Sequence, residues 1–135
     1  MTSTTTLSWI AFAIFVACAL SFDGHGTPFA VGGPLLPAKL LIWAAFVGFT
    51  AYSVYCSTRE NLFASIPKIS QLYWGRQIGT DLYLGLLLTL FLVYLNEGSA
   101  LVTLLWLLPT LAFANLATLL YFAIHFDQIV GRFLA

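Results

Sequence analysis

Charged side chains are scarce in this sequence of 135 residues: they make up 7% of it, as five basic and five acidic residues that cancel. About a quarter of a typical soluble domain is charged, so these residues could not cover a surface that faces water. The shortage of basic residues also excludes the positive field that nucleic-acid-binding proteins need. Hydrophobic residues make up 61% of the chain, which indicates that lipid is its solvent.

Motifs of soluble catalysis are missing as well. The sequence has no phosphate-binding glycine loop, no nucleophile elbow and no His-rich zinc helix. Its two cysteines, Cys18 and Cys56, fall late in different apolar runs and do not suggest a disulfide framework. No Lys or Arg precedes the first apolar run, whereas a secretory signal peptide usually carries charge there. We therefore expect no cofactor and no bound metal, and a first apolar segment that is retained.

Apolar runs divide the chain into four predicted spans. Each approaches the roughly 20 residues that cross a hydrocarbon layer of ~30 Å, with Thr4 to Ser8 extending the first and Ser70 capping the third. The last two runs are joined only by Asn96 to Ser99, so they should form an antiparallel hairpin. The predicted fold is all-α, a single-domain polytopic membrane protein with four transmembrane helices in an antiparallel bundle, at about 7–22, 39–55, 70–96 and 100–126.

Glycine and proline predict where these helices end or bend. Four glycines and three prolines between Asp23 and Ala38 forbid a regular helix and indicate an irregular loop. Asp23 and His25 in this loop are possible metal ligands, but a usable site needs three or four, so solvated loop polarity is the preferred interpretation. Pro109 removes a backbone donor and should kink the fourth helix near Leu105.

Small residues recur at helical spacing in the first three spans. Such stripes let neighbouring helices approach closely and are typical of packing faces in membranes. We interpret three stripes in this way: Ala13 with Ala17, Ala44 with Gly48 and Ala51, and Gly75 with Gly79.

The basic residues predict an orientation. The positive-inside rule places the connection between the second and third spans in the cytoplasm, because most of the basic charge flanks it, as Arg59, Lys68 and Arg76. The other two connections have only Lys39 between them. With four spans both termini would also be cytoplasmic, in agreement with Arg132, and Glu97 would be a solvated charge in an outer turn.

Asp81 is the best functional lead, because an ionisable group within an apolar helix is costly and commonly functional. In a helical hairpin centred between Glu97 and Gly98, residues at equal depth have numbers that sum to about 195. Asp81 then lies opposite Ala114 and Asn115, in the cytoplasmic half of the membrane. The predicted cluster contains Asp81, Asn115, Thr118 and a tyrosine, either Tyr52 or Tyr55.

Structural explanations of these polar residues compete with a functional site. Asp81 could cap or begin a helix that starts at Thr80, where the helix dipole favours a carboxylate, or Arg76 could neutralise it. Hydrogen bonds of Asn and Thr between helices are ordinary packing contacts. His125 and Asp127 are interpreted as polar residues at the cytoplasmic end of the fourth helix rather than as a metal pair.

The stretch from Trp74 to Tyr83, followed by Leu105–Pro109 and Asn115–Tyr121, resembles small four-span membrane families of unknown function. The resemblance covers about the second half of the chain. It implies a similar hairpin with an aspartate at the start of the third span, and no activity. The small multidrug transporters also have four spans in a chain of similar size, but they carry an essential glutamate in the first span, which has no acid here.

Three functions stay open at this point. The preferred one is a non-catalytic subunit or accessory protein that packs into a larger membrane complex through its Gly/Ala faces. The second is a membrane-embedded enzyme or binding protein for a lipid or isoprenoid, with Asp81 as the acid and Asn115 and Tyr52 positioning it. The third is a small homodimeric transporter in which Asp81 exchanges protons. The expected partners are the lipid bilayer and either a larger complex or a second copy.

Overall fold

The computed structural model describes residues 3–22, 28–29, 31–33 and 35–134. These residues form only helices and their connections, which confirms the all-α prediction. Asp23 and His25 lie outside the described residues. The helices are α1 (Ser3–Phe22), α2 (Leu36–Arg59), α3 (Leu62–Ser70), α4 (Tyr73–Glu97), α5 (Ala100–Phe113), α6 (Asn115–Ile124) and α7 (Phe126–Leu134).

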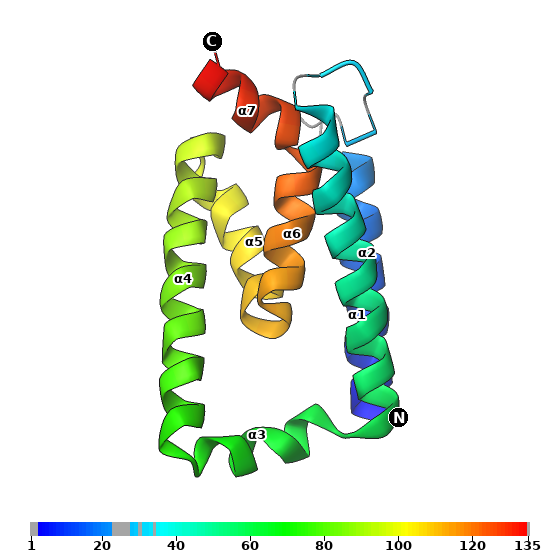
Figure 1. Cartoon of the computed structure of the whole chain (residues 1–135), viewed down its shortest axis with the longest axis vertical. Coiled ribbons are helices and arrows are strands. Elements are labelled where there is room, and N and C mark those ends of the chain that lie inside the picture. Colours follow the sequence, from blue (N-terminus) through cyan, green and yellow to red (C-terminus); the bar gives the residue numbers. More distant parts are fainter. Residues whose placement is uncertain (1–2, 23–27, 30, 34, 135) are drawn as a thin grey trace.

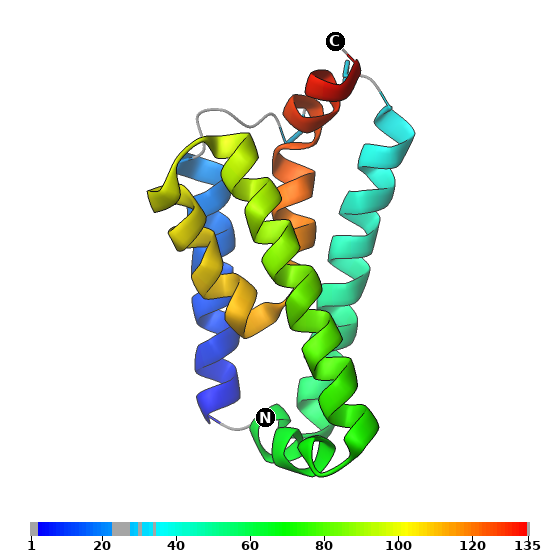
Figure 2. The ribbon, with the colours of Figure 1, turned by 90° about the vertical axis from the view of Figure 1, so that its left-hand side faces the viewer.

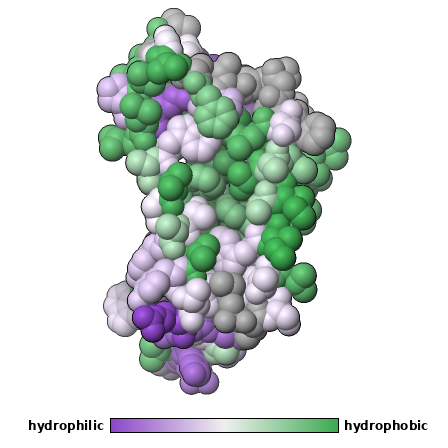
Figure 3. All heavy atoms as spheres, turned by 90° about the vertical axis from the view of Figure 1, so that its right-hand side faces the viewer, coloured by the Kyte–Doolittle hydropathy of each residue, from purple (hydrophilic) through white to green (hydrophobic). Residues whose placement is uncertain are grey.

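Three of the helices, α1, α2 and α4, are long and apolar enough to cross a membrane. They run up, down and up again between the two ends of the molecule (Figure 1). The side formed by α1 and α2 is mostly hydrophobic across its middle, with hydrophilic residues at its lower end and a smaller hydrophilic area at its upper end (Figure 3). These helices indicate a multi-pass membrane protein. The first helix begins at Ser3, so the expected extension through Thr4 to Ser8 is confirmed.

Helix α3 lies across the lower end of the molecule and connects α2 with α4 (Figure 1). The side chain of Asn61 caps α3: its Oδ1 accepts a hydrogen bond of 3.0 Å from the backbone N–H of Phe63. Ser70 is the last residue of α3, and α4 begins at Tyr73, so the prediction of a helix that starts at Ser70 was wrong. A side chain at Gly75 would collide with the carbonyl of Ile69, so this glycine permits the tight α3–α4 corner.

The hairpin between α4 and α5 matches its prediction. Helix α4 ends at Glu97, and Gly98 takes the left-handed conformation, with φ 67°, that glycine adopts without steric cost. Ser99 then caps α5. The Tyr83 hydroxyl of α4 donates a hydrogen bond of 3.1 Å to the carbonyl of Leu111 in α5. Residues of equal depth therefore pair as expected along this part of the hairpin.

The predicted fourth span is instead two short helices that fold back on each other. Helix α5 ends at Phe113, Ala114 has φ 51° and ψ −120°, and α6 returns toward the end from which α5 came (Figures 1 and 2). Helices of 14 and 10 residues extend ~21 and ~15 Å, too short to cross a hydrocarbon layer of ~30 Å. The structure therefore has three candidate spans and a re-entrant hairpin.

Tertiary packing explains why the chain reverses at Ala114. Helix α5 continues past Pro109, and the residues next to the reversal include neither Gly nor Pro. Helix α6 carries the most deeply buried large side chains of the described residues, including Leu120, Tyr121 and Ile124. In a membrane this burial acts through close packing and hydrogen bonds between helices, and the Tyr121 hydroxyl bonds to both Glu97 and Asn96. These contacts offset the strain at Ala114, since one residue in a sparsely populated conformation costs about 1–3 kcal/mol.

This strain makes Ala114→Gly a stabilising substitution. Glycine adopts a positive φ without steric cost, so we expect the free energy of unfolding to rise by about 1 kcal/mol. Unfolding in detergent micelles, followed by circular dichroism, would measure it. Ala112→Gly is the matched control, because Ala112 lies inside α5 and glycine there should cost about 1 kcal/mol. Destabilisation by both substitutions would mean that the helix continues through Ala114.

The two ends of the chain lie at opposite ends of the molecule. The start of α1 is at the lower end, near α3, and α7 lies at the upper end (Figure 1). The prediction that both termini share one face depended on a fourth span, and this arrangement does not support it because the chain turns back at Ala114. Arg132 consequently lies at the end opposite Arg59 and Arg76.

Candidate functional site

The predicted cluster around Asp81 is not joined by hydrogen bonds or ion pairs among the described residues. Asp81 is exposed on α4, Asn115 is exposed at the start of α6, and Tyr52 is 62% exposed on α2. The Thr118 hydroxyl is buried, and within the described part of the chain it has no hydrogen-bond partner. The functional roles of Asp81, Asn115 and Tyr52 therefore stay predictions.

Both structural explanations of Asp81 can also be compared with the structure. Helix α4 starts at Tyr73, two turns before Asp81, so Asp81 neither caps a helix nor begins one. The Arg76 guanidinium lies 4.7 Å from the centre of the Tyr73 ring, and it makes no ion pair with Asp81 among the described residues. The carboxyl of Asp81 thus sits in the body of an apolar helix.

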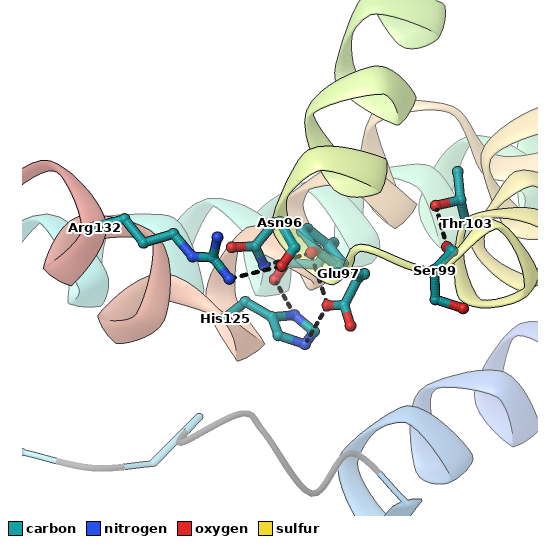
Figure 4. A network of polar contacts seen from close by, with 7 residues as sticks. Asn96, Glu97, Ser99, Thr103, His125 and Arg132 are labelled. Carbon is teal, nitrogen blue, oxygen red and sulfur yellow. Dashed lines mark hydrogen bonds and ion pairs between the residues drawn. The ribbon is translucent and has the colours of Figure 1, made fainter.

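A different polar cluster lies at the upper end of the molecule (Figure 4). It combines residues from the end of α4 with residues from α6, the α6–α7 junction and α7. The reversal at Ala114 brings His125 back to the level of Glu97, although the sequence predicted opposite ends for them. We call this cluster the polar centre, and its members are Asn96, Glu97, Tyr121, His125 and Arg132.

The carboxylate of Glu97 organises the polar centre. The Tyr121 hydroxyl donates to Glu97 Oε1 at 2.9 Å, and Asn96 Nδ2 donates to the same hydroxyl at 2.7 Å. His125 Nε2 lies 3.2 Å from Glu97 Oε1. The side chains of His125 and Glu97 are 0% and 9% exposed. In such a low-dielectric setting these polar contacts are stronger than they would be in water.

The imidazole of His125 is held in place by contacts of both its ring nitrogens and its ring face. Its Nδ1 lies 3.1 Å from the carbonyl of Tyr121; because a carbonyl only accepts, Nδ1 carries a hydrogen. Nε2 is then the nitrogen that faces Glu97, and the contact is a salt bridge when Nε2 is protonated as well. The Tyr121 ring stacks on the imidazole at 4.2 Å, and the Trp106 ring meets both edge-on.

Arg132 joins α7 to the polar centre. Its Nη2 donates a hydrogen bond of 2.8 Å to the backbone carbonyl of Asn96, in the last turn of α4. Carbonyls in the last turn of a helix lack partners within the helix, and a cation there also interacts favourably with the helix dipole. Arg132 therefore ties the end of the chain to the end of α4.

An ion pair between α2 and α7 holds the same end of the molecule. Lys39 Nζ lies 2.7 Å from Asp127 Oδ2, and the two side chains are 3% and 17% exposed. A side chain at Gly33 would collide with the carboxylate of Asp127, so glycine permits this close approach. Lys39 and Asp127 were interpreted from the sequence as polar residues near membrane surfaces, and the structure shows them as buried partners.

These arrangements have the chemistry of a structural junction. The polar centre and the Lys39–Asp127 pair connect α2, α4, α6 and α7 through charged hydrogen bonds. In the part of the chain that the structure describes, no three His, Cys, Asp or Glu residues are grouped as metal ligands would be. Sequence reasoning missed the junction because it placed Glu97 in a solvated turn. One signal was present in the sequence: Glu97 lies just before, and His125 just after, the same apolar run. A chain that folds back within this run brings the two residues together.

Comparison of the chain with protein-family models, with curated proteins and with solved structures found no match.

Proposed function

We propose that this protein is a non-catalytic subunit or accessory protein of a larger membrane complex, and that the outward face of α2 packs against a partner helix. The observation that carries the proposal is the position of Ala44, Gly48 and Ala51. All three are exposed, and they lie on the side of α2 opposite the buried Lys39 and Phe46.

The space around this face supports close packing by a neighbour. A Cβ atom built on Gly48 meets nothing within 4 Å, so no described residue fills the space that the glycine leaves. Within a membrane, helices associate through close van der Waals packing, for which small residues at the contact are favourable. The stripe that the sequence predicted as a packing face is therefore available to another protein.

The alternative functions receive less support from the geometry. An enzyme or binding protein for a lipid or isoprenoid requires Asp81, Asn115 and Tyr52 to act on one molecule, and a transporter requires Asp81 to face a path for protons. All three side chains are exposed, on three different helices, and no interaction between them is present among the described residues. A structural role in a complex needs none of these contacts.

The proposed orientation follows the basic residues. Arg59, Lys68 and Arg76 belong to the helices that meet at the lower end, and the positive-inside rule assigns that end to the cytoplasm. The N-terminus is then cytoplasmic and the C-terminus lies on the other side of the membrane. Lys39 at the upper end is neutralised by Asp127, which strengthens the charge asymmetry.

Substitutions on α2 test the proposal. We expect Ala44→Leu to reduce the amount of partner that co-purifies in mild detergent by about tenfold, because a longer side chain separates the helices. Ala45→Leu is the matched control: Ala45 is also exposed but points about 100° away from Ala44. Quantitative mass spectrometry of the purified protein measures both. Purification of the wild type with a defined lipid and no stoichiometric protein would contradict the subunit proposal and favour the lipid-binding alternative.

A further inference from the structure

Asp81 is an acidic residue on a helix that is long and apolar enough to cross a membrane. It lies eight residues after the start of α4 at Tyr73, which is ~12 Å along a helix of ~37 Å, so a hydrocarbon layer of ~30 Å centred on α4 would include it. Its side chain is exposed, and the described residues offer it neither a hydrogen bond nor an ion pair. Charged groups at this depth are costly and normally face protein, where they find a partner. No described residue is a partner for Asp81, so its carboxyl is available to a side chain of another protein.

Asp81 also belongs to a regular packing face. Seven residues of α4 are spaced alternately by four and three positions, and all seven are exposed. We call this face the α4 seam: Trp74, Ile78, Asp81, Gly85, Leu88, Leu92 and Leu95. An average spacing of 3.5 residues is that of the contact line between two helices in a left-handed coiled coil.

The α4 seam is separate from the face of α4 that the chain itself buries. The buried residues of α4 are Leu86, Leu90 and Val93, which lie roughly 135° around the helix from the seam. A Cβ atom built on Gly85 meets nothing within 4 Å, so the seam has room for a helix next to Asp81. The seam thus has the periodicity of a helix contact, and none of the described helices covers it.

We propose that the α4 seam binds a transmembrane helix of another protein that carries a Lys or Arg at the depth of Asp81. A single polar residue in an apolar seam fixes the register of the two helices, and an opposite charge at the same depth removes the cost of the buried carboxylate. This inference rests on the proposed function, and it adds the chemistry by which the partner is recognised.

A second copy of this chain does not supply that charge. Two copies with the same orientation in the membrane would place Asp81 against Asp81, and two carboxylates at one contact repel each other. The basic residues of the chain also lie away from this depth: Arg59, Lys68, Arg76 and Arg132 lie near helix ends, and Lys39 is paired with Asp127. A heterotypic partner is therefore the better match for Asp81.

Photo-crosslinking from two adjacent leucines in the membranes of the source cells tests this inference. p-Benzoylphenylalanine replaces either Leu88, in the seam, or Leu87, outside it; these leucines are 68% and 59% exposed. We expect Leu88 to crosslink one protein with a Lys or Arg in a span, and Leu87 not to. Asp81→Asn should lower the crosslinked yield at least about tenfold, and a charge exchange, Asp81→Lys with an acidic residue in the partner, should restore it.

Several results would overturn the inference. These are crosslinking of Leu88 to a second copy of the chain or to lipid alone, a partner without a basic residue in its spans, and a yield that Asp81→Asn leaves unchanged. If a partner still co-purifies and is lost in Ala44→Leu, the subunit proposal stands and the α4 seam proposal fails. If no protein co-purifies and Leu88 crosslinks none, both fail. Unchanged thermal unfolding of Asp81→Asn shows that a lost crosslink reflects binding.

Discussion

Glu97→Gln is expected to lower the free energy of unfolding by at least about 3 kcal/mol, because Glu97 Oε1 faces two buried polar side chains and a hydrogen bond to a charged group alone contributes about 1.5–3 kcal/mol. The substitution leaves the fully buried imidazole of His125 without its carboxylate, and it takes the charged acceptor from the Tyr121 hydroxyl. Unfolding in mixed micelles with increasing SDS would measure the change. Glu60→Gln is the control, because that carboxylate is exposed and surface substitutions change stability by only about 0.5 kcal/mol.

A double-mutant cycle isolates the contact between Glu97 and His125. The single variants Glu97→Gln and His125→Gln and the double variant should show a coupling energy of about 1–3 kcal/mol, as interacting neighbours do. Additive effects of the two substitutions would contradict the 3.2 Å contact, and with it the reversal of the chain at Ala114. The cycle therefore tests the fold as well as the pair.

The long helices could be predicted from the sequence because each depends on a local property. An apolar run of about 20 residues has few alternatives to a spanning helix, and α2 was expected at 39–55 and found at Leu36–Arg59. The turn between α4 and α5 was also local, since Gly98 accepts a positive φ and Ser99 caps the next helix.

The reversal at Ala114 could not be predicted in this way. Phe113, Ala114 and Asn115 contain no helix-breaking residue, and Pro109, the visible breaker, is accommodated within α5. What fixes the reversal is the contact of α6 with residues far away in the sequence, such as the Tyr121 hydroxyl with Glu97 and the Trp106 ring with Tyr121. When the reversal is missed, the residues from the end of α6 onward, including His125 and Arg132, are predicted at the lower end and not at the upper end. This is why the polar centre was missed.

The predicted site was affected by the same error in a different way. The depth of Asp81 was estimated from α4 and α5 alone, and the Tyr83–Leu111 bond supports that part of the estimate. Its pairing with Asn115 assumed that the fourth span continued past Ala114. Asn115 instead begins a helix that runs back to the upper end, so the helix that was to supply partners to Asp81 turns away from it.

The two ends of the molecule consequently differ in how their helices are held together. The upper end is closed by the polar centre and by the Lys39–Asp127 pair, which tie four helices together. At the lower end, helix α3 connects α2 with α4 (Figure 1). A closed upper end holds the spans in fixed positions, and the exposed faces of α2 and α4 are then available to partners.

Lys39→Met should be the second most damaging substitution, with an expected loss of about 3 kcal/mol in the free energy of unfolding. It leaves the Asp127 carboxylate, which is 17% exposed, beside Gly33 and without its cation. Replacing both charges, as Lys39→Met with Asp127→Leu, should cost less than Lys39→Met alone, because apolar side chains of similar size often replace a buried ion pair without penalty. Equal losses in the single and the double variant would contradict a buried pair.

Lys68→Met is the control, since Lys68 is exposed on α3. If Lys68→Met proved as damaging as Lys39→Met, the loss of stability would result from the removal of a positive charge and not from the loss of the contact with Asp127. Lys39→Met should leave crosslinking from Leu88 unchanged under conditions where the protein is folded, because the ion pair and the α4 seam lie on different helices; this separates the role of the closed upper end in stability from the role of α4 in binding.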